Sequence, residues 1–258
     1  MSIKKELDLA GKVAVVTGGS RGLGLAMAQA LGEMGARPVI IARKQDELDE
    51  ARAQLAERDI TAVSYRCDLG QREQIAPLVD RILQEHGRVD ILVNNAAATW
   101  AAPAEDHPIE AWDKLVALNL TGTFLLTQRI GKRSMIPNGY GRIVNIASIG
   151  GLMGQDPNIV RSIAYCTTKG GIVNFTRALA AEWAQFGITV NAICPGFIPT
   201  KMSRGRLDAV GETLLARTPS RKLGEETDLN GLAVLLGSAA SRHITGQVIA
   251  VDGGATVV

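Results

Sequence analysis

Two side chains that can exchange protons, Tyr165 and Lys169, stand four residues apart in the second half of the chain. The surrounding stretch has helical periodicity, so both side chains are expected on one face of a helix. A phenol beside an ammonium group can act as an acid or a base toward an alcohol or carbonyl oxygen. A half-buried Tyr beside a solvated Lys is the alternative. Ser148 favours a site, because it follows a strand that reads IVNIA, where α/β sheets place their ligand crevice.

A glycine-rich turn near the amino terminus is a candidate phosphate-binding element. Gly18, Gly22 and Gly24 follow an apolar run and open a helical segment. Their G-x-x-x-G-x-G spacing differs from the common dinucleotide fingerprint. Glycines still let the backbone approach a pyrophosphate, and a helix N-terminus supplies free N–H groups. An ordinary tight turn is the alternative, which the strand–turn–helix context disfavours.

The end of the second predicted strand indicates which cofactor the chain takes. An NAD enzyme needs an acid there for the ribose 2′-hydroxyl, but this chain has Ala42-Arg43. We interpret the nearest acid, Asp46, as a cap or first-turn acid of the next helix. Arg43 and Arg21 can instead bind a 2′-phosphate, since guanidinium groups match phosphate geometry. The sequence therefore predicts NADP(H), with two solvated arginines as the alternative.

Predicted strands and helices alternate along the chain. Apolar runs predict strands at 12–16, 38–42, 62–67, 89–93, 142–147, 188–193 and 247–251. Helical periodicity falls at 25–34, 46–58, 72–86, 110–135, 165–186 and 228–236. Continuously apolar strands separated by helices predict an α/β fold, a doubly wound, Rossmann-like parallel sheet with helices on both faces. We expect one domain over residues 1–258, with an irregular excursion at 197–226 that covers the substrate.

Composition and charge exclude several other classes of function. The net charge is +2 with acids and bases interspersed, so we expect no nucleic-acid partner. No apolar run approaches the roughly 20 residues that span a membrane, and the charged first residues do not form a secretory signal. Three dispersed cysteines, Cys67, Cys166 and Cys194, fit neither a disulfide framework nor a metal cluster. We predict a cytoplasmic protein without a metal site. Cys166 adjoins Tyr165, so a nucleophilic role is an alternative, but a buried thiol is the favoured interpretation.

Over essentially its full length the chain resembles the short-chain dehydrogenase/reductase family. The matching motifs are TGGSRGLG (17–24), Asp68-Leu69, NNAA (94–97), Asn119, Ser148, Tyr165-x-x-x-Lys169, and Pro195-Gly196 with Thr200. Two features depart from the family pattern. NNAA replaces the usual NNAG, and the interval between Ser148 and Tyr165 is a few residues longer than in many members. The second departure concerns the wall of the pocket rather than the chemistry.

The resemblance implies a role for each catalytic candidate. Tyr165 would be the general acid in reduction and the base in oxidation, with its phenolate favoured by Lys169. Lys169 would also hold the nicotinamide ribose. Ser148 would hydrogen-bond the carbonyl oxygen, where negative charge develops. Asn119 would anchor a water that links Lys169 to solvent; the alternative is a helix-interior Asn satisfied by its neighbours.

The expected contacts to NADP(H) follow from the glycine-rich turn and from the resemblance. They are Gly18, Ser20, Arg21, Gly22, Leu23, Gly24, Arg43, Asp68, Leu69, Asn95, Ala96, Tyr165, Lys169, Pro195, Gly196, Ile198 and Thr200. The resemblance assigns Asp68 and Leu69 to the adenine, and Asn95 and Ala96 to the adenosine ribose. It assigns the group from Pro195 to Thr200 to the carboxamide side of the nicotinamide. Asp68 is otherwise a turn residue or cap.

The substrate is less well determined, because the family acts on many alcohols and ketones. Residues 180–202 look most like gluconate 5-dehydrogenases and related polyol or carbonyl reductases, so a small-molecule sugar acid or polyol is the best guess. The alternative is a 3-oxoacyl thioester, but such reductases usually have an Arg before the helix Glu, and here Ala181 precedes Glu182. Some excursion cations could bind a carboxylate or phosphate: Lys201, Arg204, Arg206, Arg217, Arg221 and Lys222. A non-catalytic nucleotide-binding regulator is a further alternative, disfavoured by the complete catalytic set.

The helices predicted at 110–135 and 165–186 are apolar on more than one face. A surface helix of a monomer should show one apolar stripe about 100° wide. The family resemblance implies that these helices pack against their copies across a two-fold axis, giving a homodimer, and that the last strand adds the interface of a homotetramer. Burial beneath the excursion is the alternative.

Overall fold

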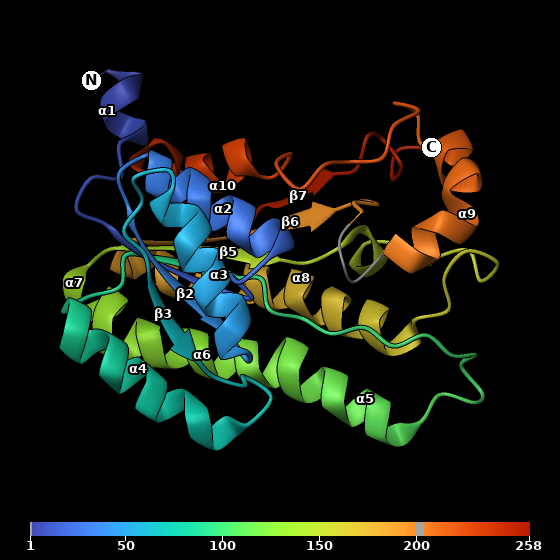
Figure 1. Ribbon diagram of the computed structural model, residues 1–258, viewed down its shortest axis with the longest axis horizontal. Helices are drawn as coiled ribbons and strands as arrows, with labels where there is room; N and C mark the ends of the chain where they lie inside the picture. Colours follow the sequence, from blue (N-terminus) through green and yellow to red (C-terminus); the bar gives the residue numbers. More distant parts are fainter. Residues whose placement is uncertain (1, 200–203) are drawn as a thin grey trace.

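One parallel sheet forms the centre of the molecule (Figure 1). The computed structural model describes residues 2–199 and 204–258, with side chains in the second range described from residue 211. Its strands are β1 (Val13–Thr17), β2 (Arg37–Ala42), β3 (Val63–Arg66), β4 (Ile91–Asn94), β5 (Gly141–Ile146), β6 (Ile188–Pro195) and β7 (Val248–Val251). The order is β3-β2-β1-β4-β5-β6-β7, and every neighbouring pair is parallel. The predicted doubly wound α/β fold is confirmed.

Helices cover both faces of the sheet (Figure 1). They are α1 (Ile3–Leu7), α2 (Gly22–Glu33), α3 (Gln45–Ala56), α4 (Arg72–His86), α5 (Ile109–Val116), α6 (Thr123–Ile130), α7 (Ile136–Asn138), α8 (Ile163–Trp183), α9 (Arg204–Arg217) and α10 (Asn230–Gly237). Buried side chains of α2, α3 and α10 share one hydrophobic cluster with the sheet. Those of α4, α6 and α8 share the cluster on the opposite face.

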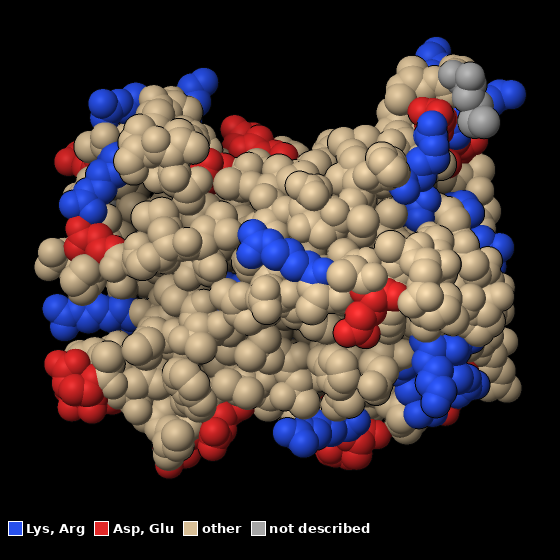
Figure 2. All heavy atoms as spheres, turned by 180° about the vertical axis from the view of Figure 1, so that it is seen from behind, with Lys and Arg blue, Asp and Glu red and all other residues tan. Residues whose placement is uncertain are grey.

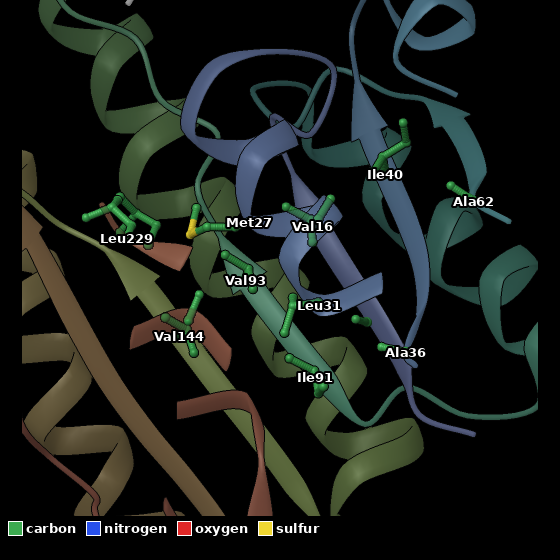
Figure 3. Packing of buried hydrophobic residues seen from close by; sticks show 14 of the residues in the cluster. Val16, Met27, Leu31, Ala36, Ile40, Ala62, Ile91, Val93, Val144 and Leu229 are labelled. Carbon is green, nitrogen blue, oxygen red and sulfur yellow. The ribbon is translucent and has the colours of Figure 1, made fainter. Parts of the chain in front are cut away.

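The strands contribute alternate side chains to the two clusters. Val16 points into the α2 side, where Figure 3 shows it among Met27, Leu31 and Val93, whereas Val15 belongs to the cluster beneath α4. Both valines are fully buried. Because each face is covered by helices, the central strands are mostly apolar rather than alternating in polarity.

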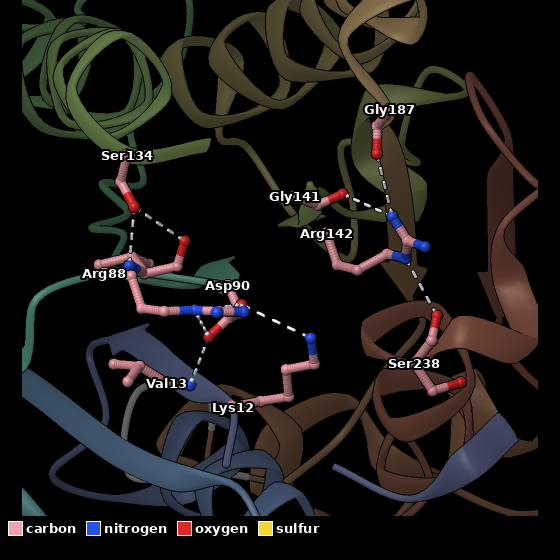
Figure 4. Close-up of polar contacts among 10 residues, drawn as sticks. Lys12, Val13, Arg88, Asp90, Ser134, Gly141, Arg142, Gly187 and Ser238 are labelled. Atoms are coloured by element: carbon pink, nitrogen blue, oxygen red, sulfur yellow. Dashed lines mark hydrogen bonds and ion pairs between the residues drawn. The ribbon is translucent and has the colours of Figure 1, made fainter. Parts of the chain in front are cut away.

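Polar side chains close the amino-terminal edge of the sheet, opposite the ends that carry the candidate site (Figure 4). The buried carboxylate of Asp90 accepts the Val13 N–H at 2.9 Å and pairs with Arg88. Arg142 is 4% exposed, and its guanidinium donates to the carbonyl oxygens of Ser238 (3.0 Å), Gly141 (2.9 Å) and Gly187 (3.3 Å). Burial lowers the pKa of Arg142. These contacts join the starts of β1, β4 and β5 to the segments beside them.

One predicted helix is present with an internal irregularity, and one helix of the structure was not predicted. The helix expected at 110–135 is continuous, but π-helical turns at Ala117–Gly122 and Gly131–Met135 separate its α-helical parts α5, α6 and α7. Gly122 lies so close to the Leu69 carbonyl oxygen that a Cβ at this position would overlap it. The first π-helical turn thus ends where the helix backbone packs directly against the segment that contains Leu69. The excursion at 197–226 contains the 14-residue helix α9, which the sequence analysis did not predict. Its glycines and charges weaken the periodic signal.

Among the helices of the described residues, none combines the length and apolar composition needed to cross a bilayer.

Candidate active site

A cavity of about 890 Å³ opens where β1, β4, β5 and β6 end, on both sides of the point where the strand order reverses. Open α/β sheets bind their ligands at this position. The predicted site residues that line it are Gly18, Ser20, Arg21, Gly22, Leu23, Gly24, Arg43, Leu69, Asn95, Ala96, Ser148, Tyr165, Lys169, Pro195, Gly196 and Ile198. Asp68 and Asn119 are not among the lining residues. Thr200 lies outside the described residues.

The glycine-rich turn has the shape of a phosphate cradle. Gly18 and Gly22 have φ angles of +63° and +55°, a region that favours glycine. A Cβ at Gly18 would come within 2.8 Å of the Asn95 side-chain nitrogen, and one at Gly24 would overlap the Gly18 carbonyl oxygen. The turn leads directly into α2, whose first N–H groups have no partner within the helix. The residues present therefore fit a dinucleotide pyrophosphate.

Hydrogen bonds fix the NNAA segment against this turn. Asn95 donates through Nδ2 to the carbonyl oxygens of Thr17 at 2.9 Å and Gly18 at 3.3 Å. The Thr17 hydroxyl in turn accepts the backbone N–H groups of Asn95 and Ala96, both at 2.9 Å. None of these bonds involves position 97, so Ala97 in place of the usual glycine leaves them unchanged.

At the far end of the cavity, cations gather around the end of β2. Arg21, Arg43 and Lys44 line it, together with Glu47. Arg21 Nη1 lies 2.7 Å from Glu47 Oε1, and Lys44 Nζ lies 3.2 Å from the same oxygen. Asp46 stands in the first turn of α3, as interpreted from the sequence.

The three central catalytic candidates line one end of the cavity. Ser148 stands just beyond β5, and its hydroxyl oxygen accepts the Gly150 N–H at 3.1 Å. Lys169 is buried, donates to the Ile146 carbonyl oxygen at 2.6 Å, and has its ammonium 5.6 Å from the centre of the Tyr165 ring. Burial lowers the pKa of Lys169 from 10.5 to about 8. The Tyr165 ring is partly exposed to the cavity.

Asn119 lies behind the cavity in the first π-helical segment, with its side chain 2% exposed. Its Oδ1 accepts the Ala98 N–H at 2.9 Å, and Nδ2 donates to the Ala98 carbonyl oxygen and the Thr168 hydroxyl, each at 3.0 Å. Both amide hydrogens are thus used by the protein. This bonding ties the NNAA segment to α8 beside Lys169, which sequence reasoning did not foresee. The expected water remains a prediction.

Asp68 has local partners. Its Oδ1 accepts the Gly70 N–H at 3.0 Å, and its backbone N–H donates to Gln74 at 2.9 Å. This is the turn role that the sequence analysis gave as its alternative, and the adenine contact of Asp68 remains a prediction.

The wall between β5 and α8 holds site residues that sequence reasoning missed. Gln155, Val160 and Ser162 line the cavity. Cys166 contacts Gln155 Oε1 and the Ser162 hydroxyl through its sulfur, each at 3.6 Å, and is not a lining residue. Cys166 is only partly buried, which corrects the expectation of a buried thiol, and its sulfur packs against the side chains of this wall. The long interval between Ser148 and Tyr165 pointed to the wall, but nothing in it identified these side chains.

The chain is similar to known proteins over its full length. Residues 12–210 match a family model described as short chain dehydrogenase. An NAD-dependent glycerol dehydrogenase of Listeria innocua is 39% identical over 98% of this chain and 97% of its own length. Gluconate 5-dehydrogenase of Gluconobacter oxydans is 36% identical over 100% of this chain and 99% of its own length. A solved gluconate 5-dehydrogenase from Burkholderia cenocepacia, in complex with NADP and tartrate, has a TM-score of 0.94 and 32% identity, with 100% of both chains covered.

Proposed function

The chain belongs to the short-chain dehydrogenase family and is an oxidoreductase of CH–OH groups that uses NAD(P), and we propose that NADP(H) is its cofactor and a sugar acid or polyol its substrate. The observation that carries the proposal is the placement of Ser148, Tyr165 and Lys169 in one cavity with the glycine-rich turn. The catalytic set disfavours a non-catalytic regulator.

The chain's own residues handle the proton and the developing charge. Bound NADP(H) supplies the hydride chemistry. Tyr165 donates a proton to the carbonyl oxygen in reduction and accepts it in oxidation, and the nearby Lys169 ammonium favours the phenolate. Because Ser148 Oγ accepts the Gly150 N–H, its own hydroxyl hydrogen can point to an oxygen in the cavity, where negative charge develops. Asn119 joins the backbone at Ala98 to Thr168 of α8, the helix that carries Tyr165 and Lys169.

Arginines at the end of β2 support NADP(H). The chain has no acid at positions 42 and 43, and Arg21 and Arg43 both line the cavity. The Burkholderia relative was solved with NADP, whereas the Listeria relative is named as NAD-dependent, so membership of the family alone does not decide between the two cofactors. We base the choice of NADP(H) on the positive charge at this end of the cavity.

The wall of the cavity supports a hydroxyl-rich substrate. Gln155 and Ser162 add an amide and a hydroxyl group to the end of the cavity that holds Tyr165. Position 181, where thioester reductases carry an Arg, is an exposed Ala. Among the excursion cations, Arg217 pairs with Asp156, and Lys222 lines a neighbouring cavity of about 360 Å³, where it could meet a substrate carboxylate. The side chains of Lys201, Arg204 and Arg206 lie outside the described residues.

We further propose that residues 1–258 act as one catalytic domain whose excursion covers the substrate. Phe197, Ile198 and Glu226 line the cavity from this segment. The three cysteines of the chain are free thiols, which favours a reducing, cytoplasmic location.

Absorbance at the nicotinamide band, followed with NADPH and NADH against sugar acids, polyols and 3-oxoacyl thioesters, tests the substrate. We expect NADPH-linked turnover with sugar acids or polyols. Turnover confined to thioesters would favour the alternative enzyme, and cofactor binding without turnover across the panel would favour a regulator.

Tyr165→Phe tests the chemistry. The variant should bind NADPH as the wild type does, measured by fluorescence titration, and lose nearly all turnover, because only the proton donor is removed. Turnover within a few-fold of wild type would exclude Tyr165 as the acid.

A further inference from the structure

The phosphate end of the cavity contains a carboxylate surrounded by donors. Glu47 Oε1 pairs with Arg21 Nη1 at 2.7 Å and with Lys44 Nζ at 3.2 Å. The Ser20 hydroxyl lies 3.5 Å from the other carboxylate oxygen. These donors come from two segments, the glycine-rich turn and the start of α3. One acceptor therefore draws together groups that are far apart in the sequence.

The carboxylate is more enclosed than the two cations that it contacts. The Glu47 side chain is 17% exposed, whereas those of Arg21 and Lys44 are 47% and 61% exposed. Glu47 also stands in the first turn of α3, where the helix dipole favours a negative charge. The carboxylate is thus the partner held by the protein, and the two cations lie at the solvent-exposed rim.

A guanidinium, an ammonium and a hydroxyl converging on one anion are also the groups that bind a phosphate monoester. Ser20, Arg21, Lys44 and Glu47 all line the cavity, so a cofactor phosphate at its far end meets the same donors. Glu47 and such a phosphate therefore call on the same donors. A 2′-hydroxyl brings no charge to this place, but a 2′-phosphate brings close to two negative charges.

We propose that Glu47 is a cofactor-selectivity residue that competes with the 2′-phosphate of NADP(H) for Arg21 and Lys44 and so limits the preference for NADP(H) over NAD(H). The proposal rests on the proposed use of NADP(H). Binding of the phosphate requires the two cations to turn away from Glu47, which then lies near the phosphate as a like charge. NAD(H) leaves both ion pairs intact.

Glu47→Gln removes the charge and keeps the shape of the side chain. Dissociation constants for NADP+, NAD+ and adenosine 2′,5′-bisphosphate, measured by calorimetry without substrate, test the proposal. We expect NADP+ and the bisphosphate to bind about three- to tenfold more tightly, the scale of one or two exposed charge interactions, and NAD+ to change less than twofold. The gain should shrink at high salt, because exposed charges are screened.

Glu50→Gln is the matched control, since Glu50 lines the same cavity on α3 and is exposed. It should change each constant less than twofold. The proposal is overturned if both variants tighten NADP+ equally, if Glu47→Gln weakens NAD+ instead, or if it changes nothing. Failure of the NADP(H) proposal itself would look different, because neither wild type nor Glu47→Gln would then bind the bisphosphate.

Discussion

Lys169 keeps a titratable ammonium group inside the protein, where burial lowers its pKa from 10.5 to about 8. Between these two values the unfolded chain binds more protons than the folded chain, so the stability linked to this residue rises with pH across that window. Below pH 8 the lysine is charged in both states. The buried charge then costs the folded state about 3 kcal/mol, from roughly 2.5 pH units at 1.36 kcal/mol each.

Lys169→Met replaces the ammonium by an uncharged side chain of similar length. The variant should be inactive yet more stable than wild type at pH 7, and its advantage should shrink by about 2 kcal/mol by pH 9.5. Urea unfolding of both proteins at the two pH values measures the difference. The titration of other groups largely cancels in that difference, including Cys194, whose pKa burial raises to about 11. A variant no more stable than wild type at pH 7 would show that the folded state compensates the charge.

Arg43→Ala tests the phosphate-binding role of a second cavity cation. Loss of a charge-assisted contact costs about 1.5–3 kcal/mol, so the Michaelis constant for NADPH should rise roughly ten- to a hundredfold. NADH lacks the phosphate and serves as the control within the same variant. Steady-state kinetics with NADPH and NADH measures both Michaelis constants. An equal rise in the two constants would refute the phosphate-binding role of Arg43.

Residue types at fixed spacing carried most of the site prediction. Ser148, Tyr165 and Lys169 line one cavity because a strand end and one helix face position them. Asn119 was found only through the family resemblance, and its bonds to Ala98 and Thr168 join segments that no local pattern connects. Gln155 was missed for the same reason. Its place in the wall depends on the path of a loop, which sequence periodicity does not encode.

At the scale of elements, the buried strands were the most predictable, because helices on both faces make them continuously apolar. The ends of the strands differ from the predicted ranges by one or two residues. For example, β6 continues to Pro195, which pairs with Val251. The helix α4 matches its predicted range. The π-helical turns of 117–122 and 131–135 leave helical periodicity nearly unchanged, so the sequence could not reveal them. The helix α9 was obscured by its charges and glycines.

An ion pair joins two elements across the substrate side of the site. Arg217, the last residue of α9, pairs with Asp156 in the loop between β5 and α8, next to the cavity residue Gln155. The backbone N–H of Asn158 and the Arg217 guanidinium lower the pKa of Asp156, so the pair is complete at neutral pH.

Asp156→Asn should loosen this link and raise the substrate KM up to about fivefold, the usual range of an exposed ion pair, while NADPH affinity stays constant. Kinetics at low and high salt measure the effect, and high salt should make wild type resemble the variant. Asp113→Asn, at an exposed position on α5, is the control. A parallel loss of NADPH affinity would show that the link supports the whole cavity instead.

At the scale of the molecule, most of the excess apolar surface of α8 is satisfied within the chain. Ile172, Val173, Leu179 and Ala180 are buried in clusters formed with the sheet, and so need no second copy to cover them. Other large apolar side chains do remain exposed: Trp100 (48%), Ile109 (63%), Phe124 (44%) and Ile163 (45%). They belong to α5, α6, α8 and the loop before them.

Large parts of the surface carry no charged side chains and could form an interface. On the face in Figure 2, acidic and basic side chains form small, interspersed groups, some at the margin and some near the centre, and most of the area carries no charge. Phe124 stacks edge-on against Phe175, with ring centres 6.2 Å apart, so an exposed aromatic of α6 is already fixed against α8. A rigid, apolar helix surface of this kind suits contact with a second copy.

We therefore predict a homodimer or homotetramer in which α5, α6 and α8 pack against their copies, since closed two-fold assemblies are the commonest oligomers. Phe124→Glu should dissociate it and lower both thermal stability and activity, because α8 carries Tyr165 and Lys169 and would lose its outer support. Light scattering at micromolar concentration, with kinetics on the same samples, measures both effects. Ile3→Glu changes an apolar residue on α1 that is 60% exposed, and it should leave the assembly intact. A stable, fully active wild-type monomer of 27.3 kDa would instead show that these exposed side chains serve no interface.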